Sequence, residues 1–136
     1  MSVSEGIQVY DETRKIENAS GVAAYLAVVY TSTENGCDLP GGANASGCIG
    51  ITLEAQATQN KAVAVRRQGL CYATIAGVCS VGDRLVINGT AGKLKAGETT
   101  GTTIQWVVAR AEQDATDGDV IWVTVQEPYP YRPALT

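Results

Sequence analysis

Apolar and polar residues alternate through the middle of this chain, most clearly over residues 61–88. The apolar positions there are mostly valine, leucine and isoleucine, and Gly69, Gly77 and Gly82 interrupt them. Such alternation is typical of half-buried β-strands, whereas an amphipathic helix needs apolar residues three and four positions apart and few glycines. The stretch is therefore predicted to form three strands, with a first turn at Gly69 and a second before Leu85.

Similar patterns predict further strands on both sides of this central unit. They cover residues 22–31, 48–57, 93–95, 104–111 and 120–126. Residues 36–47 hold four glycines and a proline, so they are predicted to be a surface loop.

Ile49 and Ile51 are expected to point to one face of their strand. Trp106 and Trp122 are expected in the core, because tryptophan is usually well buried.

Both ends of the chain differ from the middle. Residues 1–20 alternate only weakly, so they are predicted to form an extended arm that can add to the edge of another sheet, with a frayed terminus as the alternative. Residues 128–136 contain three prolines, which lack the N–H donor of a sheet ladder, so an extended tail is predicted. The residues by which arm and tail would contact neighbouring subunits or a partner are Val3, Ile7, Val9, Tyr10, Ile16, Tyr129 and Tyr131.

These elements together predict a mainly β fold, a small single-domain β-barrel or sandwich over residues 21–127 with an extended N-terminal arm and a Pro-rich C-terminal tail. The length of 136 residues fits one domain with one core. Its apolar residues are mostly alanine and valine, whose burial contributes modestly per residue. Part of the stability is therefore expected to come from assembly.

The charge and hydropathy of the chain limit its partners. The net charge is −4 and no long basic run occurs, so binding to nucleic acid is not expected. No apolar run approaches the roughly 20 residues that span a bilayer, and the first residues lack the pattern of a signal peptide. We therefore expect no membrane partner and synthesis in a cytoplasm.

Four cysteines, Cys37, Cys48, Cys71 and Cys79, occur without a single histidine and without a C-x-x-C pair. This spacing argues against a metal site, because zinc sites usually combine such pairs or histidines. One interpretation is four reduced, buried thiols, as cytosolic proteins usually have. The other pairs Cys37 with Cys48 and Cys71 with Cys79 after release into an oxidising medium.

Catalytic residues are scarce. A serine or cysteine nucleophile needs a base, yet histidine is absent and no G-x-S-x-G motif occurs. Neighbouring acids, such as Asp11 with Glu12 and Asp117 with Asp119, lie in polar segments where nothing would raise a carboxyl pKa. We therefore expect no enzyme activity and no cofactor.

A series of short motifs resembles the capsid cement, or head decoration, proteins of tailed bacteriophages. The resemblance spans about residues 21–126, and its most telling piece is the turn Val81-Gly82-Asp83-Arg84-Leu85, which precedes a G-K-L turn. The other motifs are I-G-I-T-L-E-A from Ile49, A-V-A-V-R from Ala62, G-L-C-Y-A from Gly69, W-V-V-A-R-A from Trp106 and G-D-V-I-W-V-T-V from Gly118. The chain departs from the family in the loop between Cys37 and Cys48 and in its Pro-Tyr tail.

The resemblance implies a β-rich virion protein, usually a homotrimer, that binds the major capsid protein on the outer surface of a mature head and stabilises it without catalysis. Linked contacts in an oligomer would strengthen such binding. The alternative is a ligand- or carbohydrate-binding β-module of a phage fibre or surface protein. Such modules usually expose a row of aromatic rings, for which Tyr129 and Tyr131 are the candidates here.

Overall fold

The structure is a computed structural model that describes residues 9–133. Within that part of the chain nine strands follow one another, and no helix is long and apolar enough to cross a membrane. The strands are β1 (Tyr10–Ile16), β2 (Ala27–Tyr30), β3 (Gly36–Asp38), β4 (Cys48–Thr52), β5 (Ala62–Thr74), β6 (Arg84–Ile87), β7 (Leu94–Ala96), β8 (Gln105–Ala111) and β9 (Val120–Tyr131). The prediction of a mainly β single domain is confirmed.

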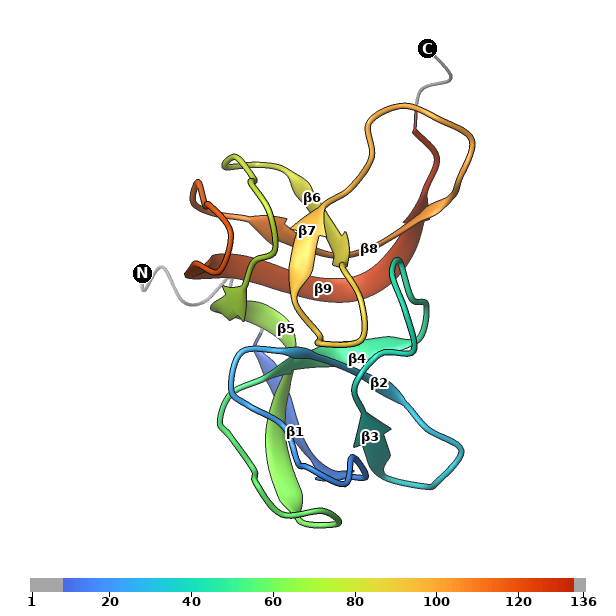
Figure 1. The fold of residues 1–136 in the computed structure, drawn as a ribbon, viewed down its shortest axis with the longest axis vertical. Helices are drawn as coiled ribbons and strands as arrows, with labels where there is room; N and C mark the ends of the chain where they lie inside the picture. The colour runs from blue at the N-terminus through green and yellow to red at the C-terminus, as the bar shows by residue number, and fades with distance from the viewer. Residues whose placement is uncertain (1–8, 134–136) are drawn as a thin grey trace, which may run out of the picture.

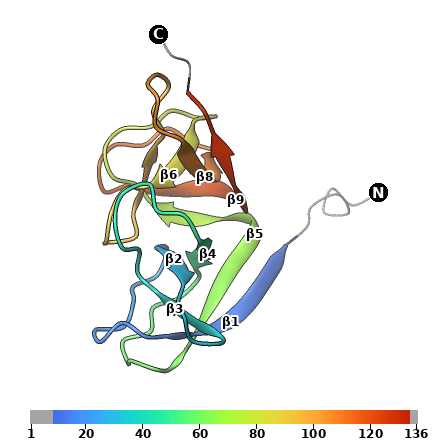
Figure 2. The ribbon, with the colours of Figure 1, turned by 90° about the vertical axis from the view of Figure 1, so that its right-hand side faces the viewer.

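The strands form two small barrels that share the long strand β5 (Figure 1). In the first barrel the order is β1-β3-β2-β4-β5, and the ring closes because β5 also pairs with β1. In the second barrel the order is β5-β9-β8-β6-β7, and a bridge between Ile75, just after β5, and Leu94 of β7 joins its ends. Figure 2 shows β5 running from one unit into the other. Closure of both sheets leaves few edges with unpaired backbone groups.

Strand β5 continues through the position at which a turn was predicted. Its first half pairs with β1 and β4, and its second half, from Gly69 onward, pairs with β9. Gly69 has a φ of 116°, a conformation that residues with a Cβ atom rarely adopt. The glycine therefore bends the strand instead of ending it, and the bend lies where β5 passes from the first barrel to the second.

Each barrel has its own buried cluster. That of the first barrel consists of Ile16, Val22, Val28, Cys37, Ile49, Val63 and Val65. The larger cluster of the second barrel includes Cys71, Ile75, Leu85, Ile87, Leu94, Val108, Ile121 and Val123.

Strand β4 lies between the two cores, and all five of its residues are buried. Ile49 belongs to the first cluster, but Ile51 belongs to the second, so the expectation that both share one face is wrong. The pairing of β2 with β4 shifts by one residue between Val28 and Val29, and such an irregularity interrupts the regular alternation of side chains.

Residues 10–16, which the sequence placed in an arm, form β1 inside the first barrel. They pair with β5 along most of their length, and Lys15 and Ile16 also pair with β3. Ile16 is 0% exposed in the barrel core. Polar residues dominate β1 because its outer face is solvated, so the weak alternation concealed a barrel strand. Val3 and Ile7 lie outside the described residues.

The C-terminal segment also departs from its prediction. Strand β9 runs on to Tyr131 through Pro128 and Pro130, and its last residues pair with β8, Pro130 opposite Trp106. The pairing of β9 with β5 ends at Val125, so among the described strands this last part of β9 pairs with β8 alone. Proline is tolerated on such an edge, because an N–H that would face away from the ladder has no partner to lose.

Candidate interaction surface

Apolar side chains gather on the outer wall of the second barrel, where β5 and β9 pair. Along both strands alternate residues are buried in the barrel, so the residues between them point outward. The cross-strand pairs on this wall are Leu70 with Thr124, Tyr72 with Trp122 and Thr74 with Val120. We call the exposed set Leu70, Tyr72, Val120 and Trp122, together with the neighbouring Tyr25, the aromatic face.

Three rings form the centre of the aromatic face. Tyr72 and Trp122 are stacked with centroids 4.0 Å apart and an interplanar angle of 23°, and the Tyr25 ring meets Tyr72 edge-on at 5.6 Å. Tyr72 and Trp122 remain 38% and 37% exposed. Trp122 was expected in the core, and this expectation is wrong because its position on β9 faces outward. Trp106 is half-buried.

The backbone holds this cluster in place. Tyr25 has a φ of 66°, which only a small share of non-glycine residues adopt, and its N–H donates to the Thr52 carbonyl at 2.8 Å. The Thr74 N–H donates to the Tyr25 carbonyl at 3.0 Å. These two bonds tie the segment before β2 to β4 and β5, so the Tyr25 ring is fixed beside Tyr72.

Polar groups border the aromatic face on the β8 side. The Trp122 N–H donates to Gln113 Oε1 at 2.8 Å, and the Thr124 hydroxyl donates to Glu112 Oε2 at 2.7 Å. An apolar centre with a polar rim is the usual composition of a protein–protein contact. Exposed apolar clusters of this kind mark interaction sites more often than single exposed side chains do.

A second cluster of rings and charges lies on β1, β2 and β5 of the first barrel. Glu12 accepts a hydrogen bond from Arg14 at 2.9 Å and one from Arg67 at 3.3 Å, and Arg67 also donates to the Tyr30 hydroxyl at 2.5 Å. The Arg67 guanidinium lies 5.7 Å from the ring centroid of Tyr10. Each charge in this network has a partner, as partly buried charges require. We therefore assign the network to stability.

The structure places the predicted contact residues in different environments. Val9 and Tyr10 are exposed, at 53% and 52%, and remain available to a partner. Ile16 is buried, so it cannot reach a neighbouring subunit while the barrel is intact. Tyr129 and Tyr131 are half-buried on β9, and the Arg84 guanidinium lies 4.1 Å from the Tyr131 ring centroid.

All four cysteines are free and buried, and none forms a disulfide. Burial raises the pKa of Cys37 to about 11 and that of Cys48 and Cys71 to about 12. Burial also raises the pKa of Cys79. Protonated, desolvated thiols are weak nucleophiles and behave as small apolar side chains. The structure describes the thiol form, and the pairing of Cys37 with Cys48 and of Cys71 with Cys79 after release into an oxidising medium stays a prediction.

The acidic residues of the turns serve the backbone. Asp114 accepts a hydrogen bond from the Val81 N–H, Asp117 from Gly77 and Asp119 from Thr116, each at 2.8–2.9 Å. Such bonds are the usual reason for aspartate in turns. Among residues 9–133 no group of three or more His, Cys, Asp or Glu side chains is placed to hold a metal ion.

Comparisons with known proteins identify a similar fold. No protein-family model matches the chain, and no curated protein matches it. A solved structure, the N base of the head fibre protein gp8.5 of bacteriophage phi29, superimposes with a TM-score of 0.61 at 14% sequence identity. The match covers 89% of this chain and 97% of the phage chain. At this identity the likeness concerns the fold, and it includes nearly all of both chains.

Proposed function

We propose that this chain is a structural protein of a phage virion that attaches to the head. The observation that carries the proposal is the match of nearly its whole length to the base of a phage head fibre. The motif resemblance to head decoration proteins is independent support, because it rests on residues such as Gly82 and Asp83 and not on the fold. Both point to proteins of the phage head.

The aromatic face is the surface that we assign to the major capsid protein. Its rings carry large apolar area, and aromatic residues dominate the binding energy of many interfaces. Trp122 and Tyr72 are already stacked in the free chain, so little side-chain entropy would be lost when a partner covers them. The protein then works by binding alone and performs no catalysis.

Self-association would strengthen this attachment. A homotrimer that presents three aromatic faces would gain affinity from linked contacts, commonly by a factor of about 100 to 10,000. If the site on the shell exists only in the mature head, binding stabilises that state by its differential affinity. In this way a small protein without reactive groups, bound to the outer surface of the head, would strengthen the capsid against internal pressure.

The test uses heads of the phage that encodes the chain, assembled without it. Purified protein is added, and co-sedimentation and cryo-electron microscopy measure occupancy. Unaltered protein should add density on the outer surface. Trp122→Ser and Tyr72→Ser should weaken binding about tenfold or more. Val81→Ser, at a residue 62% exposed in the turn before β6, should bind normally. Heads that show no added density after incubation with the folded protein would refute the attachment.

Oligomeric state is measured separately, by size-exclusion chromatography with light scattering. A mass of three chains supports the homotrimer, and a mass of 14.2 kDa at micromolar concentration contradicts it. Head binding by a monomer would leave attachment standing and remove only the contribution of linked sites. The two parts of the proposal are therefore tested independently.

Carbohydrate binding is a second candidate function, favoured by the same rings. Trp122 and Tyr72 are exposed, and the side chains of Glu112 and Gln113 lie beside them as hydrogen-bonding groups. Arg84 lies over one face of the Tyr131 ring, so we favour the aromatic face over the tail as the place for such a ligand. A glycan array separates the candidates, because a sugar ligand lost in Trp122→Ser would favour a fibre module.

A further inference from the structure

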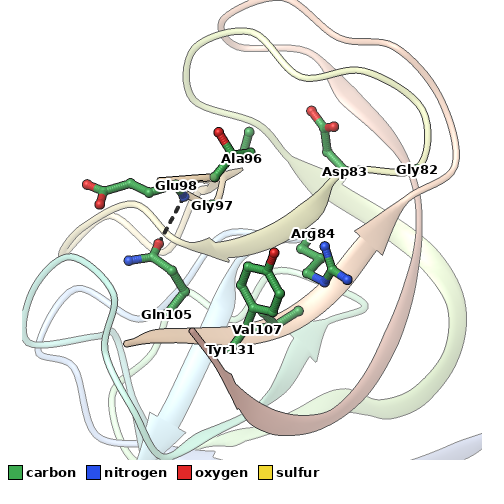
Figure 3. Close-up of a pocket in the computed structure, with 10 residues that line it drawn as sticks. Gly82, Asp83, Arg84, Ala96, Gly97, Glu98, Gln105, Val107 and Tyr131 are labelled. Carbon is green, nitrogen blue, oxygen red and sulfur yellow. Dashed lines mark hydrogen bonds between the residues drawn. The ribbon is translucent and has the colours of Figure 1, made fainter. Parts of the chain in front are cut away.

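A pocket of about 160 Å³ opens beside the end of β9 (Figure 3). Its walls come from the turn before β6, from β7 and the residues after it, and from the start of β8. Figure 3 shows the Tyr131 ring and the Arg84 side chain next to each other in this pocket. The Arg84 Cζ lies 4.1 Å from the ring centroid, which is within the range of a cation–π contact.

Arg84 differs from four other arginines of the chain. Arg14, Arg66, Arg67 and Arg110 each donate to a carboxylate, hydroxyl or carbonyl oxygen. Arg84 has no hydrogen-bond acceptor and no ion pair among residues 9–133, and its contact is the face of Tyr131. Stacking uses the face of a guanidinium and leaves the N–H groups at its edge free for a planar anion.

The acidic residues of the pocket leave this site open. In Figure 3 the carboxylates of Asp83 and Glu98 point away from the Tyr131 ring, and Asp83 accepts a hydrogen bond from the Ser80 N–H at 2.9 Å. Gln105 is buried, and its Oε1 accepts the Glu98 N–H at 3.1 Å, which fixes the wall between β7 and β8. Arg84 is therefore the charged group beside the ring.

We propose that this pocket binds a carboxylate group of a polypeptide, either an acidic side chain or a C-terminus. The Arg84 fork would hold the two carboxylate oxygens, and the Tyr131 hydroxyl offers one further donor. A water needs about 10–15 Å³ of such space, so the pocket has room for a carboxylate and its first methylene groups. We take the carboxylate to come from another polypeptide, because the two acidic residues that line the pocket, Asp83 and Glu98, point away from the Tyr131 ring.

The site depends on the extension of β9. Arg84 starts β6, whereas Tyr131 ends β9, and only the pairing of both strands with β8 brings the two residues together. The carboxylate pocket does not require the proposed attachment to a head, since it can be measured on the isolated protein. If that attachment holds, the pocket would be a second, polar contact for a virion partner.

The test is a titration of the ¹⁵N-labelled full chain followed by NMR. The probes are acetyl-Ala-Glu-Ala-amide, acetyl-Ala-Ala-Ala with a free C-terminus, inorganic phosphate, and acetyl-Ala-Gln-Ala-amide as the neutral control. We expect one or both carboxylate peptides to shift the amide signals of Gly97 and Glu98 and the Arg84 Nε–H signal. A single carboxylate contact should bind with a Kd of about 1 mM.

Variants identify the group responsible. Arg84→Gln should weaken carboxylate binding about tenfold or more, and Arg84→Lys should recover only part of it because lysine lacks the fork. Lys95→Gln removes an equal charge from neighbouring β7 outside the pocket and should bind normally. Tyr131→Phe keeps the ring and tests the hydroxyl if Arg84→Gln does not fold.

Three outcomes would overturn the proposal. The neutral peptide could shift the same signals with equal affinity, phosphate could bind more tightly than either carboxylate, or folded Arg84→Gln could bind as well as the unaltered chain. Binding of the side-chain peptide alone, or of the C-terminal peptide alone, supports the proposal and identifies the source of the carboxylate.

Discussion

The ring of Tyr72 lies stacked on the indole of Trp122, with centroids 4.0 Å apart, on the outside of the second barrel. The residues beside them in sequence, Cys71, Ala73 and Val123, are buried inside that barrel. The largest side chains of β5 and β9 are thus on the solvent side, and small ones fill the interior. A chain that depended on these rings for its own core would place them inward.

Trp122→Ala should lower the free energy of unfolding by about 1–2 kcal/mol, less than the loss of a fully buried tryptophan, because the indole remains partly exposed. Combined with Tyr72→Ala in a double-mutant cycle, it should give a coupling energy of about 0.5–1.5 kcal/mol. Urea denaturation measures both. Simple additivity of the two substitutions would mean that the stack contributes nothing.

Val65→Asp should unfold the protein or leave it barely stable. Val65 is fully buried in the first barrel. An unpaired charge there destabilises by more than about 4 kcal/mol, which is a large part of the free energy of unfolding of a typical domain. Circular dichroism and thermal denaturation give the answer. The matched control is Val81→Asp at an exposed loop position, which should change stability by no more than about 0.5 kcal/mol.

Removal of residues 1–16 should destroy the first barrel, contrary to what an N-terminal arm would predict. The deletion takes away β1, its pairing with β5 and β3, and the buried Ile16. Removal of residues 1–8 keeps every strand that the structure describes and should leave a folded protein. Limited proteolysis of the two truncated chains distinguishes them, and a protease-resistant 17–136 fragment would count against β1 as part of the barrel.

Gly50→Ala should destabilise the protein strongly. A Cβ atom at Gly50 would lie 2.1 Å from the Arg66 carbonyl oxygen, so β4 and β5 would have to separate. Overpacking of this kind costs about 1–3 kcal/mol or more. Gly89→Ala is the control, because nothing lies within 4 Å of its Cβ position, and its stability should be unchanged or slightly higher. Equal thermal midpoints for the two variants would contradict the close approach.

Stability should fall at alkaline pH because of the buried thiols. The folded-state pKa of Cys48 is raised by burial from 9.0 to about 12, so the folded chain keeps a proton that the unfolded chain loses. The free energy of unfolding that the protonated thiol contributes is fully present below about pH 9. It declines as the pH rises toward 12, at about 1.4 kcal/mol per pH unit for each thiol.

Comparison with Cys48→Ala isolates this contribution. Urea denaturation between pH 8.5 and 10.5 measures how fast the free energy of unfolding falls with pH. The fall should be less steep for the variant, by the equivalent of about one bound proton, since tyrosine and lysine ionisation affects both chains alike. Alkylation followed by mass spectrometry should label the four thiols only after unfolding. Rapid labelling of the native protein, or identical slopes, would show that the thiols are accessible.

The sequence by itself determined the class of structure. Alternation and turn residues predicted a mainly β fold, and β8 and the first part of β9 lie within one residue of their predicted starts. The absence of histidine led to the expectation of no enzyme activity, which stays a prediction. The fold class could be predicted because hydrophobic period and turn chemistry are local properties of the chain.

Only the tertiary structure decided where the strands end and which side chains are inside. Polar β1 became a barrel strand because β5 and β3 provide partners on both sides. Pro130 stayed in β9 because β5 no longer borders that part of the strand. Trp122 lies outside the barrel, although tryptophan is usually well buried. Alternation shows that a strand has two faces, but the strands that pack against it determine which face is buried, and those contacts come from distant parts of the chain.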